Sequence, residues 1–395
     1  MTSVCLYFQV HQPYRLRRYS FFDVGRHSEY FDTALNAEII RRVASRCYVP
    51  ANKALLRAIR ALDGRFSLAF SITGVAIEQM RAHAPEALES FRELAKTGCV
   101  EFLNETYYHS LASLFDSKEF VAQVDRHREL IEEEFGLSPR AFRNTELIYS
   151  DSIGNLISSR GYRAILAEGL DRIVGSRSVG GSYRVPGGAT RLLLRDYKLS
   201  DDVAYRFNSS GADGGPLTAE VFARKISERA SNGGFVGLFM DYETFGEHLP
   251  HSSGVLEFLE KMPEAVLALG TTRFVRPGEI DTDPNNAQEL SVPEECSWAD
   301  TARDVSAWKG NSMQQSALRA VYDLAPRDPA SVALWRNLQT SDHYYYMATK
   351  VAGDGDVHSY FSSFESPYDA FIAMMNVVRD FKGRIESTRV DQRSR

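Results

Sequence analysis

The sequence predicts an α/β fold, with one large barrel and a helical extension. Short apolar runs rich in β-branched residues alternate with longer helical patterns through the first two-thirds of the chain. This alternation is typical of βα units around a mostly parallel sheet. After a stretch of Asp, Asn and Pro at 277–293, only helix-like segments follow. A length of 395 residues suits a barrel with an appendage, although two or three ordinary domains would fit it as well.

Seven apolar runs are expected to form strands, and helical patterns separate most of them. The break at 277–293 is the best domain boundary, so we expect a barrel at 1–276 and a helical domain at 294–388. The expected strands are 4–10, 65–72, 100–104, 140–145, 163–167, 191–197 and 234–241. The expected helices are 51–62, 85–96, 117–135, 148–160, 218–231 and 253–269, followed by 310–323, 329–350 and 367–388.

The charge balance argues against an electrostatic role toward nucleic acids or anionic membranes. The net charge is −6 and the pI is near 5.9, so the chain lacks the basic surface that such partners require. We expect a neutral substrate, no nucleic-acid partner and no membrane partner. Aromatic residues make up 11% of the chain, which suits sugar stacking and a large core equally well.

The cysteines and the N-terminus indicate a cytoplasmic protein. The four cysteines are widely scattered, which favours reduced thiols over a disulfide framework. The first residues enter an apolar strand without a basic leader, and no apolar run reaches the ~18 residues of a membrane span. The cysteines are Cys5, Cys47, Cys99 and Cys296.

Polar clusters follow several of the expected strands at the point where each strand ends. His11 and Gln12 follow the first strand, His109 lies shortly after the third, Glu146 follows the fourth, and Asp241 ends the last. A βα barrel places its active site at the carboxyl ends of its strands. We therefore expect these side chains to meet at one rim.

Glycoside cleavage requires two carboxyl groups that flank the scissile bond, about 5–5.5 Å apart for retention and wider for inversion. Glu146 and Asp241 are the best such pair, because each terminates an apolar run and would be held rigidly. Arg143 or another nearby donor would keep Glu146 ionised, or the two would form a surface ion pair. Any single strand-end acid is more simply explained as a helix N-cap or a rim salt bridge.

Five short segments, in this order, resemble the conserved stretches of glycoside hydrolase family 57, in particular its α-amylase-like members. Together they extend from His11 to Met347, nearly the whole chain, and the ordered set is more specific than any one of them. The segments are His11-Gln12-Pro13, 98–110, Phe142-Arg143-Asn144-Thr145-Glu146, 240–248 and 340–347.

The resemblance implies an incomplete (β/α)7 TIM-like barrel followed by a C-terminal helical bundle that lines the cleft. It implies that Glu146 is the nucleophile and Asp241 the proton donor of a retaining double displacement without a metal or other cofactor. The implied activity is hydrolysis of α-1,4-glucosidic bonds in α-glucans or maltooligosaccharides. The alternative is a 4-α-glucanotransferase or branching enzyme with the same intermediate, although the chain has little room for the long insertions of family branching enzymes.

His11, His109 and His248 are expected to bind sugar hydroxyls, and Gln12 lies in the first matching segment. Ligation of a metal, as in sugar deacetylases, and burial as core histidines are the rival interpretations, although HxxxH and CxxC spacings are missing. Glu78 would orient the ligand, or else belong to a buried ion pair.

Beyond the domain boundary, three residues are further candidates for binding the substrate. Trp298, Asp300, Trp308 and Asn311 resemble a stretch that faces the cleft in family amylases. Of these, we expect only Trp308 to stack on a pyranose ring, and its rival role is interdomain packing. Asp342 and His343 belong to the fifth matching segment and either bind sugar or lie within a helical bundle. A catalytically silent glycan-binding homologue is disfavoured, because both catalytic carboxylates are present.

Overall fold

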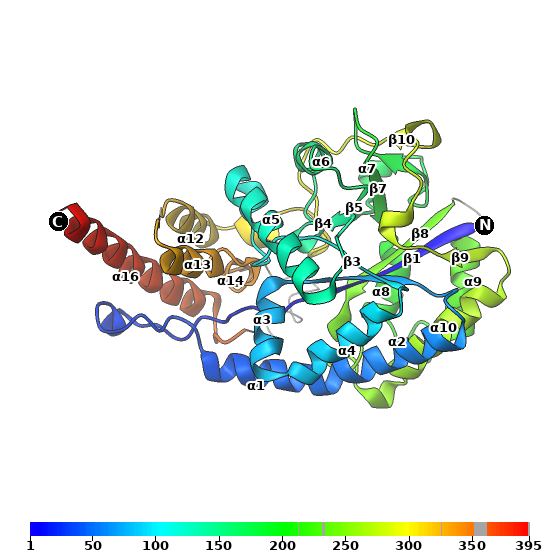
Figure 1. Cartoon of the computed structure of the whole chain (residues 1–395), viewed down its shortest axis with the longest axis horizontal. Coiled ribbons are helices and arrows are strands. Elements are labelled where there is room, and N and C mark those ends of the chain that lie inside the picture. The colour runs from blue at the N-terminus through cyan, green and yellow to red at the C-terminus, as the bar shows by residue number, and fades with distance from the viewer. Residues whose placement is uncertain (212, 231–233, 325, 351–361, 394–395) are drawn as a thin grey trace.

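A ring of seven parallel strands forms the centre of the molecule (Figure 1). The computed structural model describes residues 1–211, 213–230, 234–324, 326–350 and 362–393. All seven strands predicted from the sequence are present, and the predicted incomplete (β/α)7 barrel is confirmed. The strands are β1 (Thr2–Val10), β2 (Leu68–Ile72), β3 (Val100–Phe102), β4 (Ala141–Arg143), β5 (Ala164–Glu168), β7 (Arg191–Arg195) and β8 (Phe235–Asp241).

At two places in the ring, neighbouring strands pair over very few residues. Strands β3 and β4 meet through Asn104, whose backbone N–H donates to Ala141 and whose carbonyl accepts from Arg143. Strands β7 and β8 pair only at Arg195 and Gly237. A Cβ atom on Gly237 would lie 2.3 Å from the carbonyl oxygen of Leu194. Glycine is therefore needed for the close approach of these two backbones.

Three short strands lie outside the ring. Strand β9 (Thr272–Phe274) pairs with the beginning of β1. Strand β6 (Tyr183–Arg184) runs antiparallel to β7 and pairs on its other side with β10 (Gln288–Glu289). These additions lie toward the amino-terminal ends of the ring strands, away from the rim that carries the polar clusters.

Strand β1 is buried on both faces, as expected for a parallel strand covered by helices. Cys5 and Tyr7 point into the barrel, where they belong to a small apolar cluster, while Leu6 and Phe8 pack against the surrounding helices. This double burial explains why the strands read in the sequence as continuous apolar runs.

Helices surround the ring and continue beyond it (Figure 1). Those of the barrel are α1 (Thr33–Val43), α2 (Val49–Ala61), α3 (Gly74–His83), α4 (Pro85–Lys96), α5 (Ser117–Phe135), α6 (Asp151–Ser158), α7 (Asp171–Val174), α8 (Tyr197–Ala204), α9 (Ala219–Ala230) and α10 (Val255–Ala268). Those that follow are α11 (Ser306–Lys309), α12 (Ser312–Tyr322), α13 (Pro329–Asn337), α14 (Ser341–Tyr345) and α16 (Pro367–Arg393).

The helix predictions differ from the structure in two ways. The predicted helix 329–350 is two helices, α13 and α14, and the sequence did not predict α1, α3, α7, α8 and α11. The end of the predicted helix 218–231 lies outside the described residues. No helix in the described part of the chain combines the length and the apolar character that crossing a bilayer requires.

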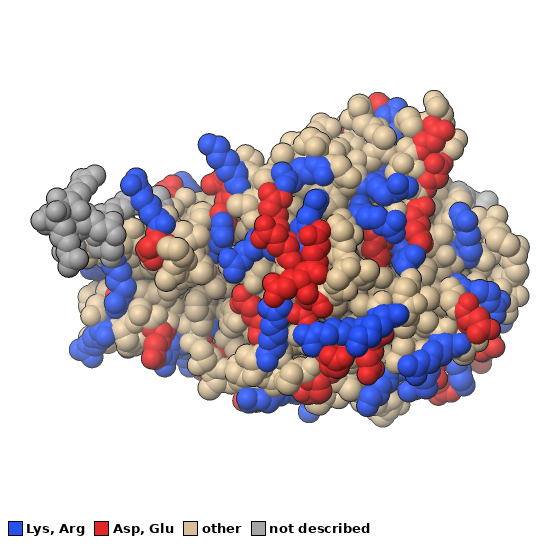
Figure 2. Space-filling model, viewed as in Figure 1, with Lys and Arg blue, Asp and Glu red and all other residues tan. Residues whose placement is uncertain are grey.

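A second apolar cluster, larger than the one inside the barrel, packs residues from the first 31 positions of the chain against the C-terminal helix α16. It contains Tyr30 from the extended segment after β1 and Phe381 from α16, and Tyr30 also donates a 2.5 Å hydrogen bond to Asp380. Figure 1 shows this segment running beside α16. We propose the division into 1–276 and 294–388 with this cluster shared between the two parts. On the face seen in Figure 2, positive and negative side chains lie interspersed over much of the surface.

Candidate active site

A cleft opens at the carboxyl ends of the barrel strands and contains about 1210 Å³ of empty space, including open solvent at its mouth. Its walls come from the ends of β1, β7 and β8, from the turns after β3 and β4, and from residues beyond 294. The lining residues are Gln9, His11, Gln12, Pro13, Arg15, His109, Glu146, Arg195, Asp201, Ala204, Tyr205, Met240, Asp241, Glu243, Thr244, His248, Trp298, Ala299, Asp300, Arg303, Asp342 and Tyr345.

Glu146 lies in the turn that follows β4, and its side chain is held by three donors. Trp298 Nε1 donates to Oε2 at 2.7 Å, while His109 Nε2 and Ser341 Oγ each lie 3.3 Å from Oε1. The residue is 7% exposed and has a φ of 55°, and the next residue, Leu147, has a φ of 51°. Such left-handed backbone is uncommon for residues other than glycine and clusters at functional sites. The turn therefore aims a nearly buried carboxylate into the cleft.

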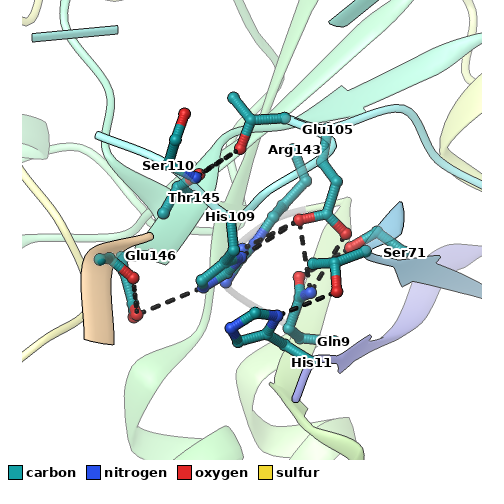
Figure 3. A network of polar contacts seen from close by, with 12 residues as sticks. Gln9, His11, Ser71, Glu105, His109, Ser110, Arg143, Thr145 and Glu146 are labelled. Atoms are coloured by element: carbon teal, nitrogen blue, oxygen red, sulfur yellow. Dashed lines mark hydrogen bonds and ion pairs between the residues drawn. The ribbon is translucent and has the colours of Figure 1, made fainter. Parts of the chain in front are cut away.

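His109 lies between two carboxylates, as Figure 3 shows. Its Nδ1 is 3.3 Å from Glu105 Oε2, and its Nε2 is 3.3 Å from Glu146 Oε1. Burial alone would lower the pKa of His109, but the hydrogen bonds to Glu105 and Glu146 outweigh burial and raise it to about 9. His109 is therefore a cation at neutral pH and donates from both ring nitrogens.

Beneath His109, the barrel holds a buried polar network (Figure 3). Gln9 donates to Glu105 Oε1 at 3.1 Å, and Arg143 Nη1 lies 3.9 Å from Glu105 Oε2. The Arg143 guanidinium lies 4.8 Å from the centre of the Trp298 ring, within the range of a cation–π contact. Hydrogen bonds and nearby cations outweigh burial and lower the pKa of Glu105, so this carboxylate stays ionised.

His11 stacks on His109 with the ring centroids 4.0 Å apart. Its Nδ1 lies 2.9 Å from Thr73 Oγ1, and its Nε2 lies 3.0 Å from Asp342 Oδ2. Burial and the neighbouring charge of His109 lower the pKa of His11. A neutral ring that donates from Nε2 to Asp342 and accepts from Thr73 fits these contacts. Asp342 thereby anchors α14 to the end of β1.

Asp241 is the last residue of β8 and pairs in register with Gln9 of β1. It is partly exposed at the cleft, and Glu243 lies two residues further on. Glu243 is buried, and its Oε1 accepts from Tyr48 Oη at 2.5 Å and from Gln12 Nε2 at 3.4 Å. Burial and the charge of Asp241 raise the pKa of Glu243 to about 8. At neutral pH Glu243 is therefore mostly protonated, next to Asp241 on the same wall of the cleft.

Most of the predicted site residues line the same cleft. They come from segments more than 300 positions apart in the sequence, which only the closed barrel and its helical extension bring together. The residues are His11, Gln12, His109, Glu146, Asp241, His248 and Asp342.

Trp308, however, is fully buried in the second apolar cluster and does not line the cleft. The expectation that it stacks on a sugar is therefore wrong, because no face of its ring is open to a ligand. Trp298, the other tryptophan near the domain boundary, lines the cleft and holds Glu146.

Glu78 and His343 also lie outside the lining of the cleft. Glu78 accepts hydrogen bonds from Tyr107 at 2.6 Å and from Tyr14 at 3.3 Å. His343 is buried, and its Nε2 donates to the carbonyl oxygen of Asn337 at 3.1 Å. Both side chains therefore have structural partners, and we do not include them among the proposed binding residues.

Several lining residues were missed by sequence analysis. Glu243 lies two positions after Asp241 in the matching segment, and this spacing could have marked it as a second acid at the end of the same strand. Asp201 and Tyr205 belong to α8 or its end, which was not predicted as a helix, and Arg303 lies in an irregular loop. Nothing in their local sequence marks them. Among the described residues, no group of three His, Cys, Asp or Glu side chains is arranged to hold a metal ion.

Comparisons with known proteins agree with the geometry. The profile of glycosyl hydrolase family 57 matches residues 5–293. A protein of Methanocaldococcus jannaschii named "putative alpha-amylase" is 37% identical over 396 aligned residues, covering 95% of this chain and 83% of the relative.

Solved structures share the fold. A family 57 branching enzyme from Thermococcus kodakaraensis aligns with a TM-score of 0.67 at 15% identity, covering 96% of this chain and 89% of that one. The α-amylase AmyC from Thermotoga maritima aligns with a TM-score of 0.59 at 13% identity, covering 97% of this chain and 96% of that one. The profile match and the identity to the archaeal relative show that the chain belongs to glycosyl hydrolase family 57.

Proposed function

We propose that this protein is a retaining glycoside hydrolase that cleaves α-1,4-glucosidic bonds of α-glucans or maltooligosaccharides. One observation carries the proposal: two carboxylic acids from separate strand ends, Glu146 after β4 and Asp241 on β8, line the same cleft. A pair of acids is what glycoside hydrolysis requires. The relative that bears an α-amylase name supports the choice of substrate.

In this proposal, Glu146 attacks the anomeric carbon and forms a glycosyl-enzyme intermediate. Its carboxylate is suited to this role because His109 supplies a positive charge on one oxygen and Trp298 donates to the other. These fixed donors hold the nucleophile in one orientation.

Asp241 protonates the departing glycosidic oxygen and then removes a proton from the water that hydrolyses the intermediate. The rigid end of β8 holds Asp241, and Glu243 beside it is neutral at neutral pH.

Polar side chains around the two acids would bind the hydroxyl groups of the sugar. We propose His11, Gln12, His248 and Asp342 for this role, because all four line the cleft and offer donors or acceptors. Trp298 adds an aromatic surface to the same cleft.

The central experiment compares Glu146→Gln and Asp241→Asn with the native protein. Each change is expected to lower kcat on a maltooligosaccharide by several orders of magnitude while circular dichroism stays unchanged. Asp241→Asn should retain far more activity on maltosyl fluoride, because fluoride leaves without protonation in the first step. Near-native turnover of Glu146→Gln would contradict the proposal.

Product analysis separates hydrolysis from transfer to a sugar acceptor. The native protein is incubated with maltopentaose and the products are resolved by length. Shorter chains alone indicate hydrolysis, which we expect. Chains longer than the substrate would instead indicate a 4-α-glucanotransferase or a branching enzyme that uses the same intermediate.

A further inference from the structure

Four charged side chains form a closed ring of ion pairs beside the cleft. Arg195 binds Glu168 at 3.1 Å and Asp201 at 2.5 Å. Arg303 binds the same two acids, at 2.7 Å and 3.1 Å. Each arginine thus bridges both acids, and the four side chains are between 0% and 16% exposed. We call this set, Glu168, Arg195, Asp201 and Arg303, the ion-pair ring.

The ion-pair ring connects two parts of the chain. Glu168 and Arg195 are paired residues at the ends of β5 and β7, and Asp201 lies on α8. Arg303 alone comes from the loop at 297–304 that follows the barrel. Guanidinium–carboxylate pairs with little solvent are the stronger kind of ion pair, and loss of one partner leaves an uncompensated charge. Arg303 is therefore one of the side chains that attach this loop to the barrel.

The loop at 297–304 has an unfavourable backbone conformation that surrounding contacts must hold in place. Asp300 has a φ of 53° and Arg303 a φ of 48°. Left-handed backbone at a residue other than glycine costs on the order of 1–3 kcal/mol and persists only where surrounding contacts impose it. The contacts at this end of the loop include the carbonyl oxygen of Arg303, which accepts from Ser297 at 3.2 Å and from Arg172 at 2.9 Å.

The other end of the same loop carries Trp298, which contacts Glu146 twice. The indole Nε1 donates to the carboxylate at 2.7 Å, and the backbone N–H donates to the carbonyl oxygen of Glu146 at 3.2 Å. The indole ring also lies 4.8 Å from Arg143 and 5.7 Å from Arg195, measured from ring centre to guanidinium carbon. The indole of Trp298 therefore contacts both Glu146 and Arg195, and Arg195 binds the same two acids as Arg303.

We propose that Arg303 is a positioning residue: it closes the ion-pair ring and thereby fixes the loop that presents Trp298 to Glu146. This inference rests on the proposed role of Glu146 as nucleophile. Arg303 also lines the cleft, so the rival role is direct contact with the sugar. The two roles differ in what they alter, because positioning changes kcat through Trp298 whereas contact with the substrate changes KM independently of Trp298.

A double-mutant cycle of Arg303→Met and Trp298→Phe tests the proposal on a maltooligosaccharide. Arg303→Met alone should lower kcat about 10–100-fold with KM within about twofold, and the double variant should match Trp298→Phe within about twofold. The acid limb of the kcat/KM profile should move to higher pH in both single variants, since a carboxylate that loses a donor is protonated more easily. Arg303→Lys should recover part of the rate.

Arg57→Met removes an ion pair between α2 and α10, whose partner is Glu260, and serves as the control because neither residue lines the cleft. Single effects that multiply in the double variant, a rise in KM alone, or native kinetics of Arg303→Met would each overturn the proposal. If Arg303→Met does not fold, the cycle is run with Arg303→Gln, which also removes the charge, under the same criteria. Glu146→Gln is measured alongside: activity in that variant would refute the proposed function, whereas its inactivity together with a multiplicative cycle would refute the role of Arg303 alone.

Discussion

The stacked rings of His11 and His109, with centroids 4.0 Å apart, differ in charge at neutral pH. Burial lowers the pKa of His11, whereas two carboxylates overcome burial and raise the pKa of His109 to about 9. The partners decide this difference: His109 bridges Glu105 and Glu146, while His11 faces one hydroxyl and one acid. The pair therefore places a neutral ring and a cation side by side in the lining of the cleft, with the cation next to the proposed nucleophile.

Replacing His109 with glutamine should lower kcat about a hundredfold at pH 7, the usual cost of removing one preorganised donor from an active site. An amide can still donate to Glu146, but it carries no charge to keep that carboxylate ionised. Steady-state kinetics on a maltooligosaccharide measure the effect. His83→Gln, on α3 and outside the cleft lining, is the control and should behave as the native protein. A kcat for His109→Gln close to the native value would show that the charge is dispensable.

Glu243→Gln should remove a pH dependence of stability. Burial and Asp241 raise the pKa of Glu243 from 4.5 to about 8. The folded state therefore binds this proton more tightly than the unfolded state, so the stabilisation is complete below pH 4.5 and is lost as pH rises through 8. At one pKa unit per 1.36 kcal/mol, the loss is about 5 kcal/mol.

Thermal unfolding of both proteins between pH 4.5 and 9 measures this difference. The native Tm should fall more steeply across the range than that of Glu243→Gln, whose amide oxygen can still accept from Tyr48 and Gln12. Parallel pH profiles of the two proteins would contradict the assignment of the proton to Glu243.

The sequence predicted the barrel better than it predicted the wall of the cleft beyond residue 294. Glu146 and Asp241 were found because parallel strands bring their carboxyl ends to one rim, so a strand pattern alone places them together. Trp308 rather than Trp298 was expected to face the cleft, but both occur in similar local contexts after the domain boundary, so the local sequence does not tell them apart. Which ring faces the cleft depends on a loop that turns through left-handed backbone at Asp300 and Arg303, and such turns leave no periodic signal.

His343 was predicted as a binding residue for a related reason. Asp342 and His343 are neighbours on α14, a helix of five residues. Consecutive helical residues point about 100° apart, so only one of them can face the cleft. A helix this short has too few residues to reveal its buried face by periodicity. Long-range packing decided that Asp342 meets His11 while His343 faces the interior.

His343→Gln should make the protein more resistant to acid. Burial lowers the pKa of His343 from 6.5 to about 4, with Asp342 opposing the shift and Arg15 and His11 adding to it. The unfolded state therefore binds the proton more tightly, and stability is lost as pH falls from 6.5 to about 4. The loss is about 3 kcal/mol.

Urea unfolding of native protein and His343→Gln at pH 7 and pH 4.5 tests this prediction. Glutamine can retain the donor to the Asn337 carbonyl without a titrating ring. The variant should lose less stability on acidification than the native protein does. An equal loss in both proteins would place the acid-sensitive group elsewhere.

Gly237→Ala should weaken the junction between β7 and β8. The added methyl group would lie 2.3 Å from the carbonyl oxygen of Leu194, and a backbone atom cannot move aside without separating the strands. Arg195 and Gly237 are the only residues that pair these strands in the described part of the sheet. We expect a loss of about 3 kcal/mol, at the upper end of ordinary overpacking.

Gly234→Ala provides the matched control, because no atom of the described residues lies within 4 Å of its added Cβ atom. Its stability should stay within about 0.5 kcal/mol of the native value, as for most surface changes. Urea midpoints and Tm values of the three proteins decide the matter. Because Arg195 joins this junction to the ion-pair ring, Gly237→Ala should also lower kcat, and Gly234→Ala should not. Equal stability of the two alanine variants would mean that the barrel tolerates a wider gap between β7 and β8 than the close approach of Gly237 implies.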